Sequence, residues 1–148
     1  MLLNSQKHTS WSFYKKESIM IRVLLFSVLA SISFSSCQEI DENILPVVGI
    51  YRAHVVGVAG PFDLIISTDR GDDVIIEAPF DGFDWYTLKA DIDNQTERTM
   101  DINIRNQQIA TFTDIKGSGF FRDGTIELRY SINFDGDIVH FKLVGTKI

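Results

Sequence analysis

The segment APFDGFDWYTL, residues 78–88, places four aromatic side chains and two carboxylates within eleven positions. Aromatic rings beside carboxylates can stack on a sugar ring and accept hydrogen bonds from its hydroxyl groups. A second interpretation is that the aromatics fill one end of a β domain, because large aromatic side chains usually serve the core. The candidate ligand patch consists of Phe80, Asp81, Phe83, Asp84, Trp85 and Tyr86.

Other reactive side chains are sparse along the chain. After the single cysteine, Cys37, the chain contains only two histidines, His54 and His140, which excludes a Cys/His zinc site and a further cysteine nucleophile in residues 38–148. Gly117-Ser118-Gly119 lacks the spacing of a G-x-S-x-G elbow, and its glycines indicate a bulge or close strand packing instead. A glycosidase needs two carboxylates across a cleft, for which so small a domain has little room. We therefore expect no catalytic residue, no metal and no cofactor, and a hydrolase using Asp pairs is the least favoured alternative.

The charge of the chain restricts its partners. The formal net charge is −6, and residues 38–148 carry ten Lys or Arg against nineteen Asp or Glu, a net −9. Nucleic-acid binding depends on Lys and Arg that neutralise phosphates, so a nucleic-acid partner is not expected. The same negative charge argues against electrostatic adhesion to anionic lipid.

The first 36 residues are typical of a secretory signal segment. VLLFSVLA, residues 23–30, is an apolar stretch between Arg22 and the Ser-rich run SISFSS, and it is shorter than the roughly 20 residues of a membrane-spanning helix. Met20 directly precedes this signal, so we interpret it as the true start of the protein. Residues 1–19 then result from an upstream start-codon error, and the alternative is that they form an extended basic n-region of the signal.

The cysteine that follows is identified through a known family. Phe34-Ser35-Ser36-Cys37 resembles the lipobox of bacterial lipoproteins, although Phe34 stands where leucine is usual. The resemblance implies cleavage before Cys37 and a lipid thioether on it, and several acyl chains hold a protein durably on a membrane. Acidic residues 39, 41 and 42 resemble the signal that sends lipoproteins of Bacteroidota-type bacteria to the outer face of the outer membrane. We therefore expect residues 37–46 to form a lipidated, acidic tether on a single domain, residues 47–148.

The domain itself has the period-two alternation of an all-β protein, with turn residues about every ten positions. In TIELRYSINF, residues 125–134, every second residue is apolar, which predicts one buried face and one solvated face. Asp135-Gly136 favours a type I′ turn that pairs Phe134 with Asp137 and Leu128 with Leu143. The other predicted strands cover residues 48–58, 62–68, 73–78, 85–92, 99–105, 108–114 and 116–122.

About eight or nine such antiparallel strands can form a small closed or partly open barrel, or alternatively a two-sheet sandwich. Gly49-Ile50-Tyr51 is similar to the Gly-x-Trp start of lipocalin-like and calycin-like barrels, which favours the barrel. If Tyr51 points inward, His54 points outward.

These features favour a non-catalytic, lipid-anchored protein of the cell envelope. Its expected role is to bind a small molecule or a glycan, which requires an open barrel mouth or an exposed aromatic patch around Trp85. The alternative is a structural or accessory subunit of an outer-membrane protein complex, which predicts a filled core and an exposed apolar face.

Overall fold

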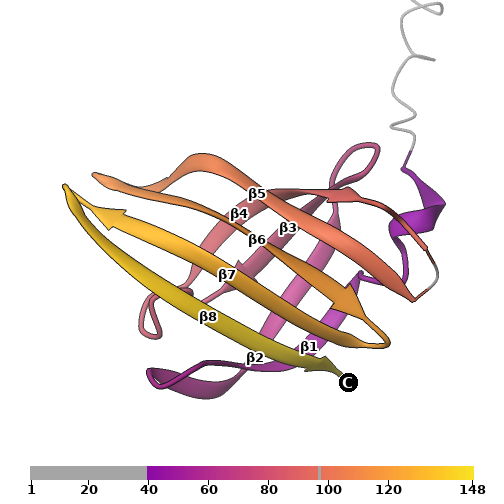
Figure 1. The fold of residues 1–148 in the computed structure, drawn as a ribbon, viewed down its shortest axis with the longest axis horizontal. Helices are drawn as coiled ribbons and strands as arrows, with labels where there is room; N and C mark the ends of the chain where they lie inside the picture. Colours follow the sequence, from indigo (N-terminus) through magenta and orange to yellow (C-terminus); the bar gives the residue numbers. More distant parts are fainter. Residues whose placement is uncertain (1–39, 97) are drawn as a thin grey trace, which may run out of the picture. The chain divides into compact units, whose positions relative to one another are not determined.

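The computed structural model describes residues 40–96 and 98–148, which form a closed barrel of eight antiparallel strands (Figure 1). Each strand pairs with the next in the chain, and β8 pairs with β1, so the predicted meander closes as a barrel and not as a sandwich. This arrangement is consistent with a lipocalin-like fold. After the 3-10 helix η1 (Glu42–Ile44), the strands are β1 (Gly49–Val55), β2 (Ala59–Thr68), β3 (Asp73–Ala78), β4 (Tyr86–Asp93), β5 (Thr99–Ala110), β6 (Thr113–Arg122), β7 (Thr125–Phe134) and β8 (Asp137–Lys147).

The predicted signal segment and the lipid attachment at Cys37 lie outside the described residues. Within the described part of the chain, the structure contains no helix with the length and apolar character needed to cross a membrane. The predicted tether, residues 37–46, is partly packed on the barrel, because Ile44 is fully buried and the backbone N–H of Asp41 donates to the carbonyl of Gly71 at 2.9 Å.

Side chains from every strand fill the interior of the barrel. The alternation of each strand sends its apolar residues inward, where they make one buried cluster with Ile44 and Val47. One fully or almost fully buried residue from each strand illustrates this: Tyr51, Leu64, Ile76, Leu88, Ile102, Ile115, Leu128 and Leu143. Tyr51 therefore points inward as predicted, and its hydroxyl donates to the carbonyl of Val47 at 2.5 Å.

The hairpin of β7 and β8 confirms the predicted turn and register. Phe134 pairs with Asp137 and Leu128 with Leu143, and both turn residues have positive φ, 51° at Asp135 and 106° at Gly136. Positive φ at both positions is what a two-residue type I′ turn requires. The side chain of Asn133 accepts a hydrogen bond from the Gly136 N–H at 2.8 Å and fixes the turn.

The prediction of three strands between residues 99 and 122 is wrong, because two long strands occupy this region. The polar run Arg105-Asn106 does not end a strand but forms an irregularity in the register of β5. The chain turns at Thr111 and Phe112, where Phe112 has a positive φ of 57°. An aromatic residue rarely adopts this conformation, so the sequence gives no turn signal there.

The seam between β4 and β5 is the least paired part of the barrel wall. Only Asp91, Ile92 and Asp93 have partners on β5, which makes this the shortest of the eight ladders described. Beyond them, the side-chain amide of Gln107 takes the place of a backbone partner for Lys89. Its Oε1 accepts from the Lys89 N–H at 2.9 Å, and its Nε2 donates to the Lys89 carbonyl at 2.7 Å.

Two glycines let β6 lie very close to β7. A Cβ atom at Gly117 would lie 2.4 Å from the carbonyl oxygen of Arg129, and one at Gly119 would lie 2.1 Å from that of Glu127. Both distances are far below an ordinary van der Waals contact. The close packing predicted for the Gly117-Ser118-Gly119 segment is therefore confirmed.

The meander sorts the connections between strands to the two ends of the barrel. The β1–β2, β3–β4, β5–β6 and β7–β8 connections share one end, because antiparallel neighbours reverse direction at each turn (Figure 1). The other end receives the β2–β3, β4–β5 and β6–β7 connections. The described chain enters at this second end, where Ile40 bridges to Gly71 of the β2–β3 turn.

Candidate functional site

The structure divides the predicted ligand patch into buried and exposed parts. Phe80 is fully buried and packs edge-on against Tyr130, with ring centroids 5.5 Å apart. The Tyr130 hydroxyl donates to the Phe80 carbonyl at 2.6 Å. Burial, followed by the nearby Asp81 charge, raises the pKa of Tyr130 well above its usual range. Phe80 therefore closes the end of the core, as the second interpretation of this segment proposed, and is not available to a surface ligand.

Asp81 organises the β3–β4 connection. Its Oδ1 accepts hydrogen bonds from the backbone N–H groups of Phe83 and Asp84, at 2.8 and 2.9 Å, and its Oδ2 accepts one from the Tyr86 hydroxyl at 3.0 Å. Burial and this hydrogen bond raise the pKa of Tyr86 to about 12. Both carboxylate oxygens are thus occupied within the loop. Asp81 acts as a structural acceptor, and it does not form with the exposed Asp84 a pair of free carboxylates that face each other.

Phe83 and Trp85 are the exposed members of the predicted patch. Phe83 is 80% exposed and Trp85 is 57% exposed. Both lie in the β3–β4 loop, whose backbone is held in place by hydrogen bonds to Asp81. The loop also lies against the β1–β2 connection, because a Cβ atom at Gly82 would lie 2.7 Å from Cγ1 of Val58. The aromatic pair therefore adjoins a second exposed apolar segment.

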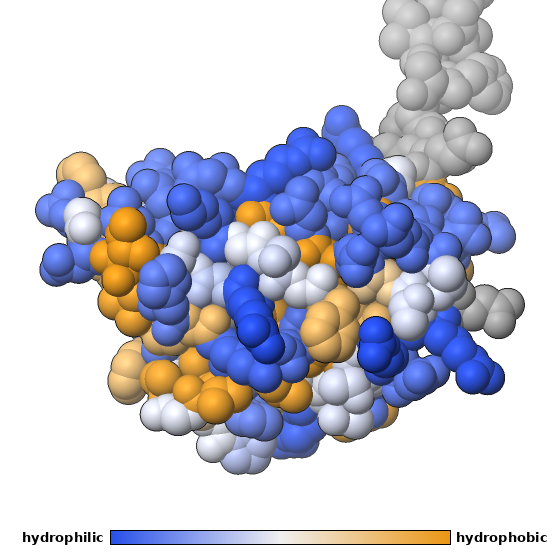
Figure 2. Space-filling view, in the orientation of Figure 1, coloured by the Kyte–Doolittle hydropathy of each residue, from blue (hydrophilic) through white to orange (hydrophobic). Residues whose placement is uncertain are grey.

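The remaining two connections at this end also expose apolar residues. Phe112 is 70% exposed and Ile138 is 60% exposed, and the Asp135 N–H donates to the Phe112 carbonyl at 2.9 Å, which joins the two turns. Figure 2 shows hydrophobic residues gathered at the left of the view, where the β5–β6 and β7–β8 turns lie. We call the exposed large apolar residues of these connections and of the adjoining start of β8 the tip surface: Val56, Val58, Phe83, Trp85, Phe112, Ile138 and Val139.

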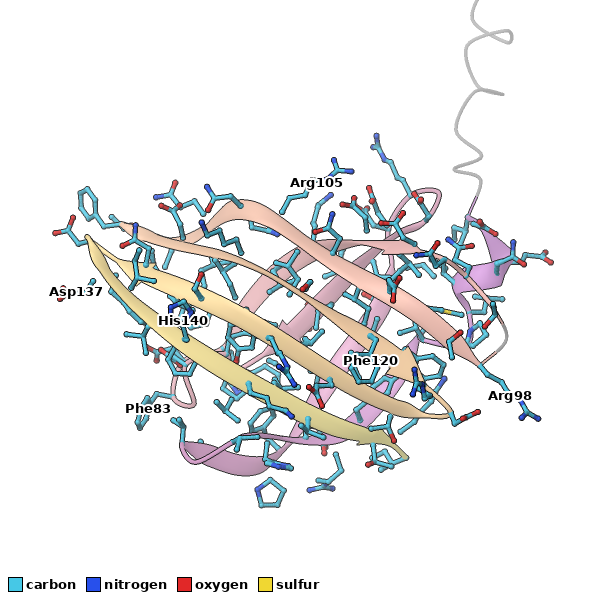
Figure 3. All side chains as sticks on the ribbon, in the orientation of Figure 1. Phe83, Arg98, Arg105, Phe120, Asp137 and His140 are labelled. Atoms are coloured by element: carbon cyan, nitrogen blue, oxygen red, sulfur yellow. The ribbon has the colours of Figure 1, made fainter. Side chains whose placement is uncertain are left out.

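Five of these seven residues were not predicted as site residues. Ile138 and Val139 follow the regular alternation of β8, which predicts that one of them is buried, but Val139 is still 41% exposed. The reason is that β5 to β8 are longer than β1, β3 and β4, so the inward face of their turns has no opposite wall to pack against. The only sequence signal for the exposure of Ile138 and Val139 is that two consecutive apolar residues stand beside a turn. Figure 3 shows Phe83 and Asp137 toward this end and Arg98 toward the other.

The two histidines do not form a metal site. His54 is exposed as predicted, and β1 lies beside β8, but His54 pairs with Val144, four residues along β8 from His140. Four residues along a strand span roughly 13 Å, too far for both rings to bind one ion. Across the described residues, no group of three or more His, Cys, Asp or Glu is placed to hold a metal.

The end where the described chain enters is acidic. Asp73 on β3 lies directly across from Asp91 on β4, and the Arg105 Nε lies 2.7 Å from Asp91 Oδ2. Burial first, then the hydrogen bond to Asp91 and its negative charge, raise the pKa of Asp73. Lys89 pairs with Asp69 beside them. This group is a network of carboxylates and cations, and the repulsion between its carboxylates is only partly compensated.

We expect Asp73→Asn to stabilise the protein at neutral pH. A raised pKa means that the folded state binds the Asp73 proton more tightly than the unfolded state, so the stabilising contribution exists in acid and is lost as the pH rises through the folded-state pKa. Removing one of two opposed like charges is worth about 0.5 kcal/mol, or roughly 2–4 °C in Tm. Thermal unfolding from pH 7 down to below the ordinary Asp value of 3.8 should show the gain at pH 7 and none in acid. Asp137→Asn, at the other end, controls for net charge, and an Asp73→Asn protein no more stable than wild type at pH 7 would contradict this prediction.

The comparisons with known proteins give no family for this chain: no family model, no curated protein and no solved structure matches it.

Proposed function

We propose that this chain is a lipid-anchored cell-envelope protein that binds a protein partner through the tip surface, as an accessory subunit of an outer-membrane complex. The observation that carries the proposal is that three of the four connections at one end, and the start of β8 beside the fourth, expose large apolar side chains while the interior is filled. Large apolar side chains that gather exposed at one end of a domain are typical of an interaction site. A filled barrel supports contact at its surface over capture of a ligand inside it.

The closed sheet supports side-chain contact as the mode of binding. A partner often adds a strand to the exposed edge of a sheet, but β1 and β8 pair with each other and leave no such edge. The tip surface instead offers aromatic anchors such as Trp85, and large aromatic residues dominate the binding energy of many interfaces. Asp84, Asp135 and Asp137 lie beside it in the chain, which favours a partner with a basic rim.

The proposed anchor places the tip surface away from the membrane. Cys37 precedes Ile40 by three residues, a distance of at most about 10 Å even when fully extended. Ile40 bridges to the β2–β3 turn, at the end opposite the tip surface. A lipid on Cys37 would thus hold the acidic end near the outer membrane and present the tip surface to its surroundings.

A glycan or small molecule is the second candidate ligand, and it rests on a specific observation. Phe83 and Trp85 are exposed neighbours on a loop fixed by Asp81, an arrangement that can stack on a sugar ring. Two carboxylates were predicted to accept hydrogen bonds from the sugar. Asp84 is exposed, whereas both oxygens of Asp81 already accept hydrogen bonds from its own segment. A hydrolase has weaker support still, because it needs two free carboxylates and those of Asp81 are occupied.

Site-specific photo-crosslinking in intact cells tests the proposal. A photoreactive amino acid at Phe83, Phe112 or Ile138 should form an adduct with the same protein from at least two positions, and the same residue at Ile50, on the outer wall of β1, should not. Trp85→Ala should weaken the partner's binding about thirtyfold, the loss of one interface hot spot. Equal adducts from Ile50, or none from the three tip positions, would overturn the protein-binding proposal.

The same experiment also tests the proposed lipid anchor on Cys37. The Cys37→Ser variant should leave the membrane fraction, and its adducts from the tip positions should fall because the protein no longer lies beside its partner. If Cys37→Ser still sediments with membranes, the lipid attachment is wrong even where the tip adducts persist.

A further inference from the structure

We infer that the outer wall of the barrel carries a binding site for an oxyanion group, a carboxylate or phosphate, on strands β6 to β8. An open groove of about 930 Å³ runs over these strands, between the β5 irregularity at Asn106 and the exposed Val56. Figure 3 shows His140 on this wall, on the strand β8. The size lies in the range of small-molecule sites.

The strand register places the polar side chains of the groove in two rows. Lys116, Ser131 and His140 pair directly across β6, β7 and β8 and form the first row. Arg129 and Lys142 pair across β7 and β8 and form the second. All five alternate with inward-facing residues such as Tyr130, so they point to the outside and border the groove together. Five side chains that can donate hydrogen bonds therefore converge on one stretch of wall.

The groove also has an excess of positive charge in an acidic domain. Three other cations of the described residues each pair with a single carboxylate, as Arg52 does with Asp63 at 3.2 Å. Two cations of the groove, by contrast, share one carboxylate, that of Glu127: its Oε1 lies 2.9 Å from Arg129 Nε and its Oε2 lies 3.0 Å from Lys142 Nζ. These two cations hold the pKa of Glu127 below its usual range.

Lys116 adds to this excess, because it makes no ion pair with any residue in the part of the chain that the structure describes. Glu127 thus pairs with Arg129 and Lys142, and Lys116 adds a third positive charge with no carboxylate of its own. The site has two positive charges in excess.

The donors remain available to a ligand. Arg129 contacts Glu127 through Nε, which leaves its terminal nitrogens, and its side chain is 74% exposed. Lys142 is 40% exposed. Guanidinium and ammonium groups make their strongest hydrogen bonds to carboxylate and phosphate oxygens, and a concave surface concentrates the positive field. The chemistry therefore selects a small oxyanion over a neutral ligand.

Binding of defined probes to the full-length protein tests this site. We expect inorganic phosphate and glucuronate to bind, and glucose, which lacks the charge, not to bind, as followed by amide chemical-shift changes confined to β6–β8. Tighter binding of glucuronate would assign the group to an acidic saccharide, and tighter binding of phosphate to a phosphoester. Arg129→Gln or Lys116→Gln should weaken the binding of either probe about tenfold, and the matched Arg52→Gln, on β1 and outside the lining of the groove, should leave it unchanged.

Glu127→Gln gives the sharper result. Because Glu127 competes with the ligand for Arg129 and Lys142, its neutralisation should strengthen probe binding several-fold, whereas Asp63→Asn should not. Failure of both anions to bind, or equal effects of the Arg52 and Arg129 variants, would overturn the site. Phe112→Ser in the tip surface should leave phosphate binding unchanged, so this inference and the proposed protein contact can fail separately.

Discussion

Phe80→Ala is expected to lower the free energy of unfolding by about 4 kcal/mol, the usual cost of removing a buried phenylalanine side chain. Phe80 is fully buried, packs against Tyr130 and accepts its hydroxyl hydrogen bond through the backbone carbonyl. The truncation leaves a cavity beneath the β3–β4 loop. Urea unfolding followed by circular dichroism measures the loss.

Phe83→Ala is the matched control for Phe80→Ala, three residues away on the same loop. Its side chain is 80% exposed, so the same chemical change should alter stability by less than about 0.5 kcal/mol. Similar losses in the two variants would mean that Phe80 does not close the core.

Gly119→Ala is expected to cost about 3 kcal/mol, at the upper end of the usual range for overpacking. The new Cβ would lie 2.1 Å from the Glu127 carbonyl oxygen and 2.6 Å from Cδ2 of Leu128. A flexible side chain could move away, but the backbone of β7 can do so only by disturbing its ladder with β6. Thermal and urea unfolding should both show the loss.

Ser118→Ala tests whether the effect of Gly119→Ala is one of close packing. Ser118 lies between the two glycines on the exposed face of the same strand, so its replacement should change stability by less than about 0.5 kcal/mol. If Gly119→Ala is as stable as Ser118→Ala, β7 adapts easily and the close approach of the strands is not required.

The sequence predicted the features of this fold that depend on local alternation and on turn residues. The register of the β7–β8 hairpin follows from matching apolar faces around Asp135-Gly136, and each of these signals points to the same pairing. The inward direction of Tyr51 and the outward direction of His54 follow from the same period of two. The closure of the meander was also predicted.

The features that the sequence did not predict depend on tertiary contacts. The turn at Phe112 is held by the hydrogen bond from Asp135, a residue of another hairpin, and no local preference of Phe112 favours it. The polar run around Asn106 has the composition of a loop and therefore predicts a strand end. In the structure it is a bulge inside β5, which the composition cannot distinguish from a loop.

The candidate site was only partly predictable for a related reason. The exposure of Phe83 and the burial of Phe80 differ because one faces the barrel interior and the other does not, and the spacing of two aromatics in an irregular loop does not determine which. The members of the tip surface outside this loop come from three other connections, which only the closed topology brings to one end.

The side-chain amide of Gln107 has a consequence for how the barrel moves. Where three residue pairs and one side chain join β4 to β5, neighbouring strands elsewhere are joined by up to ten pairs. Local opening of a protein begins where the fewest hydrogen bonds and buried contacts must be broken. Amide hydrogens facing this seam should therefore exchange with solvent before those of β7, and transient separation of β4 from β5 gives the shortest route by which solvent reaches the filled interior.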